Sequence, residues 1–489
     1  MIQQLGNVNA SVANPFKVYF FVFITPVLHE RKPAAMSDQS NHNSIALSPA
    51  TEAKPDESPP HPIADAIDRY LHSTRDIKLA ARAFMPLAAK MMNKQAEDVK
   101  AEFDEADKLM ADPDGGNKAH GLKLAFSGMR KAKRLQYSRL PLQLESSLFV
   151  KVFSAFDVFT GELLNALHLM KPALFDRLNR SVSLSTVLAA KSLDALKSSV
   201  LDEEIETFRR KSYSEQFDYL ETTFGIVLRK FHRWPDFVEA SQRRNLITHC
   251  GGIVSEQYRA VCLKEGYPSA KLQAVGTSLK LGSNYFLLTC ELMHEVGLKL
   301  GQTLWRKILP EELKEADTHL NEVVYEALSQ EQWERAEIAG EFFAHQSKFS
   351  SDLYKRMATV NYAIALKKRG KLDEMKSALS THDWSASIPE FRLAESVLFG
   401  RTEEACRLIR NIGAKGQLIE EHSYHTWPLF HDLRADNEFH LAYEAVYGHQ
   451  FLLKVQLAAR EERVAIEEKA ANAVQDEVDL ELPQVEAQN

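Results

Sequence analysis

Ser147-Leu-Phe-Val-Lys-Val-Phe-Ser-Ala-Phe-Asp-Val-Phe-Thr-Gly-Glu-Leu-Leu164 is the stretch that decides the fold of this 489-residue chain. Its apolar side chains recur every three or four residues, which is the pattern of a helix with one buried face. The stripe consists of Phe149, Val152, Phe153, Phe156, Phe159, Leu163 and Leu167. It predicts a long core helix in which the phenylalanines are packing residues. We interpret the two acids, Asp157 and Glu162, as solvent-facing or helix-pairing side chains.

The composition extends this prediction to the whole chain. Low Gly and Pro counts, 20 and 18, and runs of Ala, Leu, Glu and Lys predict an all-α protein. An apolar fraction of 45% is ample for a core, and the length predicts two or three domains. The net charge of −7 excludes a generally basic surface. Any contact with a nucleic acid must therefore come from a local patch.

The cysteine and histidine spacings point to no metal and no cofactor. Four cysteines, none in a CxxC pair, indicate free thiols and a cytoplasmic protein without a zinc site: Cys250, Cys262, Cys290 and Cys406. Five histidines between His422 and His449 are irregularly spaced, so we interpret them as core or surface residues. The chain contains no P-loop, no GxSxG element and no HExxH motif, which leaves those enzyme classes without support.

Residues 1–62 are predicted to be a disordered N-terminus and linker. The apolar run Phe16–Leu28 is too short to span a membrane as a helix. A signal peptide has basic residues before its apolar run, and here no Lys or Arg precedes Lys17. We expect translation to begin at Met36, so that residues 1–35 are not part of the natural protein, and we expect no membrane association. A membrane anchor or signal at this run is the alternative.

Residues 63–140 are predicted to form an N-terminal helical region, with an interruption at Pro86 and a turn at 112–116. A basic segment follows the turn and also carries Phe126 and Tyr137. Two interpretations stay open: a strip that follows the phosphates of a nucleic acid while the rings stack on bases, or a solvated helix face. The basic residues of this candidate RNA-binding segment are Lys123, Arg130, Lys131, Lys133, Arg134 and Arg139.

Residues 311–452 are predicted to form paired helices. The stretch 363–374 aligns with 393–404 at an offset of 30 residues, and in both a glycine, Gly370 or Gly400, ends one helix before an acidic turn begins the next. This pattern resembles degenerate tetratricopeptide-type αα-hairpins. Two copies are fewer than a solenoid needs, so the segment is expected to pack against the rest as a scaffold or to bind a protein partner. Residues 453–489 are predicted to be a charged tail.

The stretch Arg243-Arg244-Asn245-Leu246-Ile247-Thr248-His249-Cys250-Gly251-Gly252 has the richest chemistry of the chain. Trp234-Pro235-Asp236 predicts the start of a helix, and Gly251-Gly252 predicts its end at His249. A guanidinium can hold a phosphate, and imidazole side chains can move protons near neutral pH. Asn245 lies four residues before His249, so its amide is expected to orient the ring.

Arg244 and His249 are five residues apart, which separates them by about 140° around an ideal helix. A single helix therefore does not make a compact site, whereas two copies facing each other across a dimer axis could. Spacing alone is weak, because Arg434 and His440 show a similar gap in an unrelated context. Arg229, Lys230, His232 and Arg233, just before the helix, are candidates for adding positive potential, and Arg243 for contacting RNA.

The motif Arg-Asn-x-x-x-His followed by glycines resembles the HEPN superfamily, in particular its Arg-x4–6-His ribonuclease branch with domains of the RiboL-PSP type. The flanks are similar too: Ser147–Leu164 resembles the first long helix, Tyr213–Phe231 the middle helix, and Asn284–Trp305 the closing helix. The resemblance covers residues 141–310 and implies a helical bundle that dimerises and brings two Arg/His pairs into one cleft. Many catalytic members carry Tyr where this chain has Gly251.

Two functions follow from the resemblance. In the first, the protein is a metal-independent endoribonuclease in which Arg244, His249 and Asn245 act on RNA to leave 2′,3′-cyclic phosphates, in a defence or toxin role. In the second, the bundle is a non-catalytic dimerisation or RNA-binding module. Gly251 and the acidic net charge favour the second function, and Asn245 within a nearly complete motif favours the first.

Overall fold

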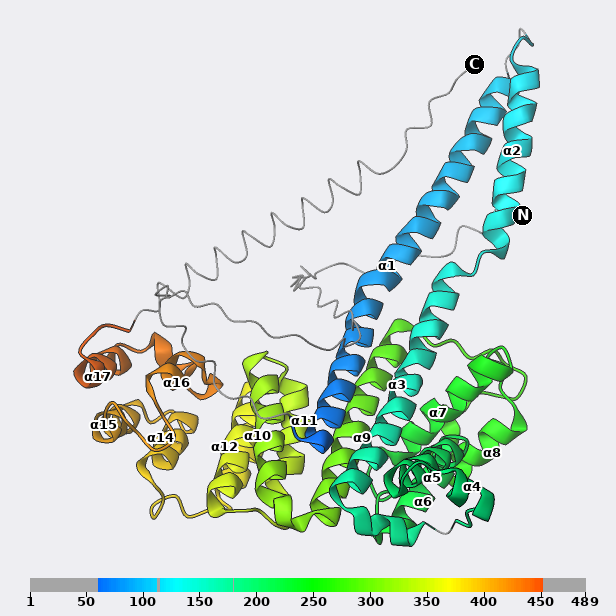
Figure 1. Cartoon of the computed structure of the whole chain (residues 1–489). Coiled ribbons are helices and arrows are strands. Elements are labelled where there is room, and N and C mark those ends of the chain that lie inside the picture. The colour runs from blue at the N-terminus through cyan, green and yellow to red at the C-terminus, as the bar shows by residue number, and fades with distance from the viewer. Residues whose placement is uncertain (1–59, 112–114, 179, 452–489) are drawn as a thin grey trace, which may run out of the picture. The chain divides into compact units, whose positions relative to one another are not determined.

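The structure, a computed structural model, describes residues 60–111, 115–178 and 180–451. The expectations for Phe16–Leu28, for a start at Met36 and for the tail at 453–489 fall outside these residues. The described part contains seventeen α-helices and no β-strand, with one isolated bridge between Ile253 and Ser278 (Figure 1). The prediction of an all-α protein is confirmed. No helix within the described ranges is both long and apolar enough to cross a membrane.

The described residues belong to two compact units, 60–432 and 433–451. The boundary expected at 310/311 does not divide them. The reason is α9 (Ser283–Ile308), which packs on α3 (Leu140–Met170) and also on α10 and α11 of the C-terminal helices. Its Glu291 accepts hydrogen bonds from Lys78 and Arg335. Burial would raise the pKa of Glu291, but these two cations outweigh it and lower that pKa to about 2.

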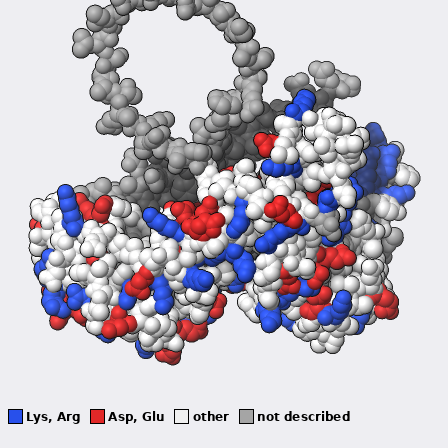
Figure 2. Space-filling view, turned by 60° about the horizontal axis from the view of Figure 1, so that its bottom comes forward, with Lys and Arg blue, Asp and Glu red and all other residues white. Residues whose placement is uncertain are grey.

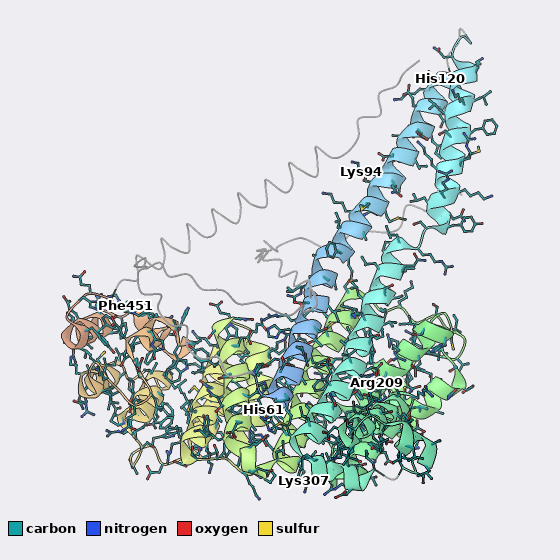
Figure 3. The ribbon with its side chains drawn as sticks, viewed as in Figure 1. His61, Lys94, His120, Arg209, Lys307 and Phe451 are labelled. Atoms are coloured by element: carbon teal, nitrogen blue, oxygen red, sulfur yellow. The ribbon has the colours of Figure 1, made fainter. Side chains whose placement is uncertain are left out.

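α1 (Pro62–Met110) is a single helix of 49 residues. Its first half buries a stripe from Ile63 to Ala81 against α3 and α9, and its second half pairs with α2 (Lys118–Tyr137). The interruption expected at Pro86 is wrong. Proline removes one hydrogen bond to the carbonyl of Arg82, but both residues are exposed, so water can satisfy that carbonyl. Figure 3 shows this hairpin running from His61 past Lys94 to the end near His120.

The core of the large unit is aromatic and is centred on α3. All seven stripe residues predicted from the sequence are buried. Phe156 stacks edge-on against Phe237 of α7 (Trp234–His249) and Tyr213 of α6 (Tyr213–Phe224), with ring centroids 5.7 Å apart in both pairs. The middle helix was expected to reach Phe231, but α6 ends at Phe224, where Gly225 adopts a left-handed conformation. α4 (Leu184–Ala189), α5 (Leu193–Arg209) and α8 (Glu256–Lys264) complete this bundle.

The C-terminal part of the large unit consists of three consecutive helical hairpins in the described chain, one more than the sequence predicts. They are α10–α11 (Leu313–Ser329 and Trp333–Ala344), α12–α13 (Asp352–Lys368 and Leu372–Leu379) and α14–α15 (Pro389–Leu398 and Thr402–Ile412). α16 (Glu421–Thr426) follows, and α17 (Asn437–Tyr447) lies in the small unit.

The extra hairpin escaped the sequence comparison because Glu331 replaces the turn glycine. Gly370 and Gly400 have φ of 76° and 72°, and Glu331 adopts the same region at 56°. In each turn the next residue donates its amide to a carbonyl five positions earlier, as in Gln332 to Ala327 at 2.9 Å. All three hairpins thus share this turn geometry, while only two of them have the glycine, at a cost of about 1–2 kcal/mol for the non-glycine residue of the third.

Candidate active site

The motif helix α7 begins and ends where the sequence predicts. Pro235 lies in its first turn, and the helix ends at His249. Gly251 and Gly252 then take φ of 59° and 77°, and the amides of Cys250 and Gly252 both donate to the carbonyl of Leu246. A tyrosine at position 251 would be strained in this left-handed turn. The departure from the HEPN pattern at Gly251 therefore has a local conformational reason.

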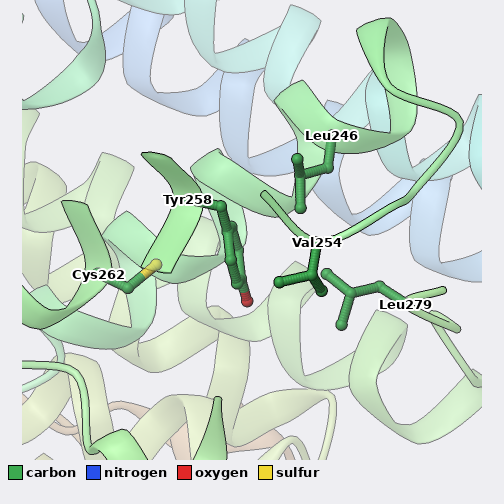
Figure 4. Packing of buried hydrophobic residues seen from close by; sticks show 5 residues of the cluster. All are labelled: Leu246, Val254, Tyr258, Cys262 and Leu279. Carbon is green, nitrogen blue, oxygen red and sulfur yellow. The ribbon is translucent and has the colours of Figure 1, made fainter. Parts of the chain in front are cut away.

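A small apolar cluster anchors the end of α7. Leu246 packs with Val254, Tyr258, Cys262 and Leu279, all of which are buried (Figure 4). The chain after the helix also pairs with residues 276–279, since Leu279 donates its amide to Gly252 at 2.8 Å. The last turn, which carries His249, is therefore fixed on its inner side while its outer side faces solvent.

Arg244 is half-buried between three helices. Its Nη1 donates to Oδ1 of Asn245 at 2.9 Å, and its Nη2 lies 3.3 Å from Oδ2 of Asp157 on α3 and 3.4 Å from the hydroxyl of Tyr213 on α6. The guanidinium also stands over the rings of Tyr213 and Phe153, about 6 Å from each centroid. Its Nε is buried and has no hydrogen-bond partner among the described residues.

Asp157 is the main partner of Arg244, and sequence reasoning left its role open. Its carboxylate also accepts a 2.8 Å hydrogen bond from the Tyr213 hydroxyl. Burial raises the pKa of Asp157, although the hydrogen bond from Tyr213 and the charge of Arg244 act against the rise. Burial and the neighbouring carboxylate raise the pKa of Tyr213 well above 10, so the phenol stays a proton donor. The only sequence signal was an acid placed inside the phenylalanine stripe.

His249 and Asn245 do not form the pair that the sequence predicts. The amide of Asn245 accepts from Arg244, and no hydrogen bond joins it to His249 in the described chain. His249 is exposed, and neither a hydrogen bond nor an ion pair is found for it within the described ranges. The competing partner is the neighbouring guanidinium, because a charged donor makes the stronger hydrogen bond. The imidazole is left accessible to a ligand.

Arg243 has a structural environment. Its Nε and Nη2 donate to the buried carboxylate of Glu239 at 2.9 and 2.8 Å, and its guanidinium lies 3.8 Å from the ring centroid of Tyr285. Glu239 also accepts hydrogen bonds of 2.5 Å from the hydroxyls of Tyr258 and Tyr285. This cluster joins α7 to α8 and α9. The interpretation of Arg243 as an RNA contact is not supported by this geometry, because the guanidinium points inward.

The other basic residues proposed to contact RNA do not lie together around Arg244. Arg233 is bound to the buried Glu295 of α9 at 3.0 Å, and Arg229 to Asp218 and Glu221, so little of their charge is available. Lys230 and His232 are exposed. The residues Arg130, Lys131, Lys133 and Arg134 lie on α2, on the hairpin and not on the bundle that holds α7 (Figure 1). On the face in Figure 2, basic side chains are interspersed with acidic ones.

The His, Cys, Asp and Glu side chains of the described residues show neither a metal-ligand cluster nor a disulfide. In the part of the chain that the structure describes, no three His, Cys, Asp or Glu side chains converge as metal ligands would. All four cysteines lie in this part and none forms a disulfide, with Cys250 exposed and the others buried. The decoy pair is of a different kind, because Nε2 of His440 contacts the backbone carbonyl of Arg434 at 2.8 Å.

A scan of protein-family models and searches of curated proteins and solved structures find no match to this chain. The resemblance to the HEPN superfamily therefore stays a prediction that depends on the residues quoted above. What the geometry adds is independent of it: a half-buried arginine held by an acid, a phenol and an amide, and an exposed histidine at the end of the same helix.

The contact with Asp157 predicts that Arg244 has a role in stability. Replacing Arg244 with alanine removes the cation from a carboxylate that is only partly exposed, and we expect the free energy of unfolding to fall by about 1–3 kcal/mol. The double variant Arg244→Ala/Asp157→Asn should recover part of that loss, because the uncompensated charge is removed as well. Urea unfolding of the three proteins measures the difference. A single variant as stable as wild type would show that the pair contributes nothing.

Proposed function

We propose that this protein is a metal-independent endoribonuclease of HEPN type, with Arg244 and His249 as its catalytic residues. The observation that carries the proposal is that one helix holds a guanidinium in place through an acid, a phenol and an amide, and carries in its last turn an exposed imidazole that has no hydrogen-bond partner in the described chain. Of the five N–H donors of Arg244, two have no partner among the described residues. One is the buried Nε and the other is on Nη1, and the side chain as a whole remains 23% exposed. A phosphate can therefore contact the guanidinium without displacing Asp157.

The chemistry needs no group beyond these side chains and RNA. The 2′-oxygen attacks the neighbouring phosphorus, the bond from phosphorus to the 5′-oxygen breaks, and a 2′,3′-cyclic phosphate and a 5′-hydroxyl result. The imidazole of His249 accepts the proton of the 2′-hydroxyl, and the imidazolium that forms donates a proton to the leaving 5′-oxygen. Arg244 stabilises the charge that develops on the non-bridging oxygens. No cofactor or metal takes part in the proposed reaction.

The positions of Arg244 and His249 on one helix call for two copies of the chain. On an ideal helix they are separated by about 140°, which favours an arrangement in which the bundles of a homodimer face each other and Arg244 of one chain meets His249 of the other. Asp157 and Tyr213 then act as positioning residues, because they hold the guanidinium and need not contact RNA. A monomer at micromolar concentration by light scattering would remove this part of the proposal.

The second candidate, a non-catalytic dimerisation or RNA-binding module, is favoured by the ion pair itself. A guanidinium already paired with Asp157 and Tyr213 has a structural reason to be there without any phosphate. The two candidates differ in one property, which is turnover of RNA by the wild-type protein.

The cellular role is proposed on the same basis. A ribonuclease of this kind would act in defence or as a toxin in the cytoplasm, where free thiols persist. The three hairpins α10–α15 are the proposed surface for a protein partner that restrains it, since stacked helix pairs commonly provide binding surfaces.

The test is incubation of the purified full-length protein with end-labelled single-stranded RNA in EDTA. We expect cleavage that continues in the chelator and products that end in a 2′,3′-cyclic phosphate, which acid treatment opens before a phosphatase can remove it. Absence of cleavage, or dependence on a divalent metal, would exclude the ribonuclease and leave the binding module.

A further inference from the structure

The segment around α2 has a net positive charge, whereas the whole chain is net negative. Residues 115–144 contain seven basic residues and no Asp or Glu, in a chain whose net charge is −7. The seven are Lys118, Lys123, Arg130, Lys131, Lys133, Arg134 and Arg139. In the described chain only Lys131 of the seven forms an ion pair, with Glu102 of α1. The other six are not neutralised by such a partner.

The packing of α2 decides which residues face outward. Gly121 and Gly128 lie seven residues apart and are buried against α1, where a Cβ at Gly121 would come within 2.9–3.1 Å of Met110, Ala106 and Leu109. On the opposite side, six residues fall within an arc of about 100° on an ideal helix. They are Lys123, Phe126, Arg130, Lys133, Arg134 and Tyr137, and all six are exposed. We name this set the α2 strip.

Rings and cations alternate along the α2 strip. Phe126 lies one turn from Lys123 and from Arg130, and Tyr137 lies one turn from Lys133 and Arg134. The two rings are 62% and 72% exposed, so both faces are accessible to a partner. The strip is about 21 Å long at 1.5 Å per residue. The hairpin carries it away from the rest of its unit, so the strip is open along its length (Figure 3).

We propose that the α2 strip binds single-stranded RNA, with Arg130, Lys133 and Arg134 on the phosphates and Phe126 and Tyr137 stacked on bases. Cations that follow a backbone, interleaved with rings that accept any base, are the features by which proteins bind single strands without sequence preference. The choice of RNA over another polyanion rests on the proposed function. The strip deepens that function by giving the enzyme a capture arm separate from its cleavage site.

A membrane surface is the competing partner, and the order of side chains argues against it. A helix that lies on a membrane has a continuous apolar face flanked by cations. On α2, Arg130, Lys133 and Arg134 separate Phe126 from Tyr137 along the helix axis, so the two rings do not form one continuous apolar face. The strip therefore matches a chain of alternating phosphates and bases better than the interior of a lipid layer.

The test is equilibrium binding of a fluorescent single-stranded RNA to the full-length protein in EDTA at several salt concentrations. The triple variant Arg130→Gln/Lys133→Gln/Arg134→Gln should bind at least tenfold more weakly. Its plot of log affinity against log salt should be shallower by about 2, since each lost phosphate contact removes about 0.7. The double variant Phe126→Ala/Tyr137→Ala should also lose roughly tenfold, with an unchanged salt slope.

The matched control places the same charge change on the other helix of the hairpin. Lys90, Lys94 and Lys100 of α1 are exposed, and Lys90→Gln/Lys94→Gln/Lys100→Gln should bind RNA within about threefold of wild type. Circular dichroism checks that all variants keep their helix content. Equal losses in the two triple variants would show general charge attraction and overturn the proposal.

The remaining outcomes separate this proposal from the proposed function. If both hold, the strip variant raises KM for RNA cleavage and leaves kcat unchanged. If wild type binds RNA through the strip but does not cleave it, only the ribonuclease fails. If the triple variant of the α2 strip binds RNA as tightly as wild type, the proposal of an RNA capture arm is wrong. If that variant also loses binding to vesicles of anionic lipid, the strip binds membranes instead.

Discussion

Replacing His249 with alanine is expected to lower the rate of RNA cleavage by about 100-fold or more, the usual contribution of a positioned acid or base. The fold should not change, because the imidazole is exposed and the core contacts of α7 come from Leu246 and the residues around it. Single-turnover cleavage of labelled RNA measures the rate, and circular dichroism with thermal unfolding checks the fold.

The decoy histidine provides the control. His440 has a similar spacing from an arginine, but its ring contacts the backbone of Arg434 and lies in the small unit. His440→Ala should therefore cleave RNA at the wild-type rate, and so should Arg434→Ala. A His249→Ala protein as active as wild type would eliminate the proposed mechanism.

Replacing Glu239 with alanine is expected to destabilise the protein by about 3–5 kcal/mol, the largest stability effect we predict. The carboxylate is buried and accepts hydrogen bonds from Arg243, Tyr258 and Tyr285. Its removal leaves the guanidinium of Arg243 buried without a counter-charge. Because the cluster joins α7 to α8 and α9, the loss should also reduce cleavage by loosening the helix that carries Arg244.

Urea unfolding followed by circular dichroism measures this effect. Glu239→Gln should cost less than Glu239→Ala, because an amide still accepts hydrogen bonds from the two tyrosines. The exposed Glu256 of α8 gives a matched control, and Glu256→Ala should change stability by less than about 1 kcal/mol. If Glu239→Ala were as stable as Glu256→Ala, the buried cluster would not support α7.

Local patterns predicted the helices well. The phenylalanine stripe identified α3, and Pro235 with Gly251-Gly252 gave both ends of α7, because each of these signals acts within a few residues. The local rules for proline and glycine gave wrong predictions at two positions. α1 continues through the exposed Pro86, and Glu331 occupies a turn conformation that usually requires glycine.

The candidate site was harder to predict because its contacts are tertiary. Arg244 contacts Asp157 and Tyr213, which lie 87 and 31 residues away in the sequence. The same competition draws Asn245 to the guanidinium and leaves His249 exposed. Arg243 stands beside Arg244 in the sequence but faces the opposite way, toward Glu239. The spacing along a helix predicts which residues share a face. The residues that each face contacts depend on how the helices of the bundle pack.

The central claim is that Arg244 of one chain and His249 of another form one RNA-cleaving site. Its most direct test uses heterodimers of Arg244→Ala and His249→Ala chains, co-expressed with two different tags and purified through both. Such a dimer has one intact pair across the interface and one pair with both residues lost. We expect about half of the wild-type cleavage activity from it, while each homodimer is inactive. A heterodimer as inactive as its parents would contradict the claim.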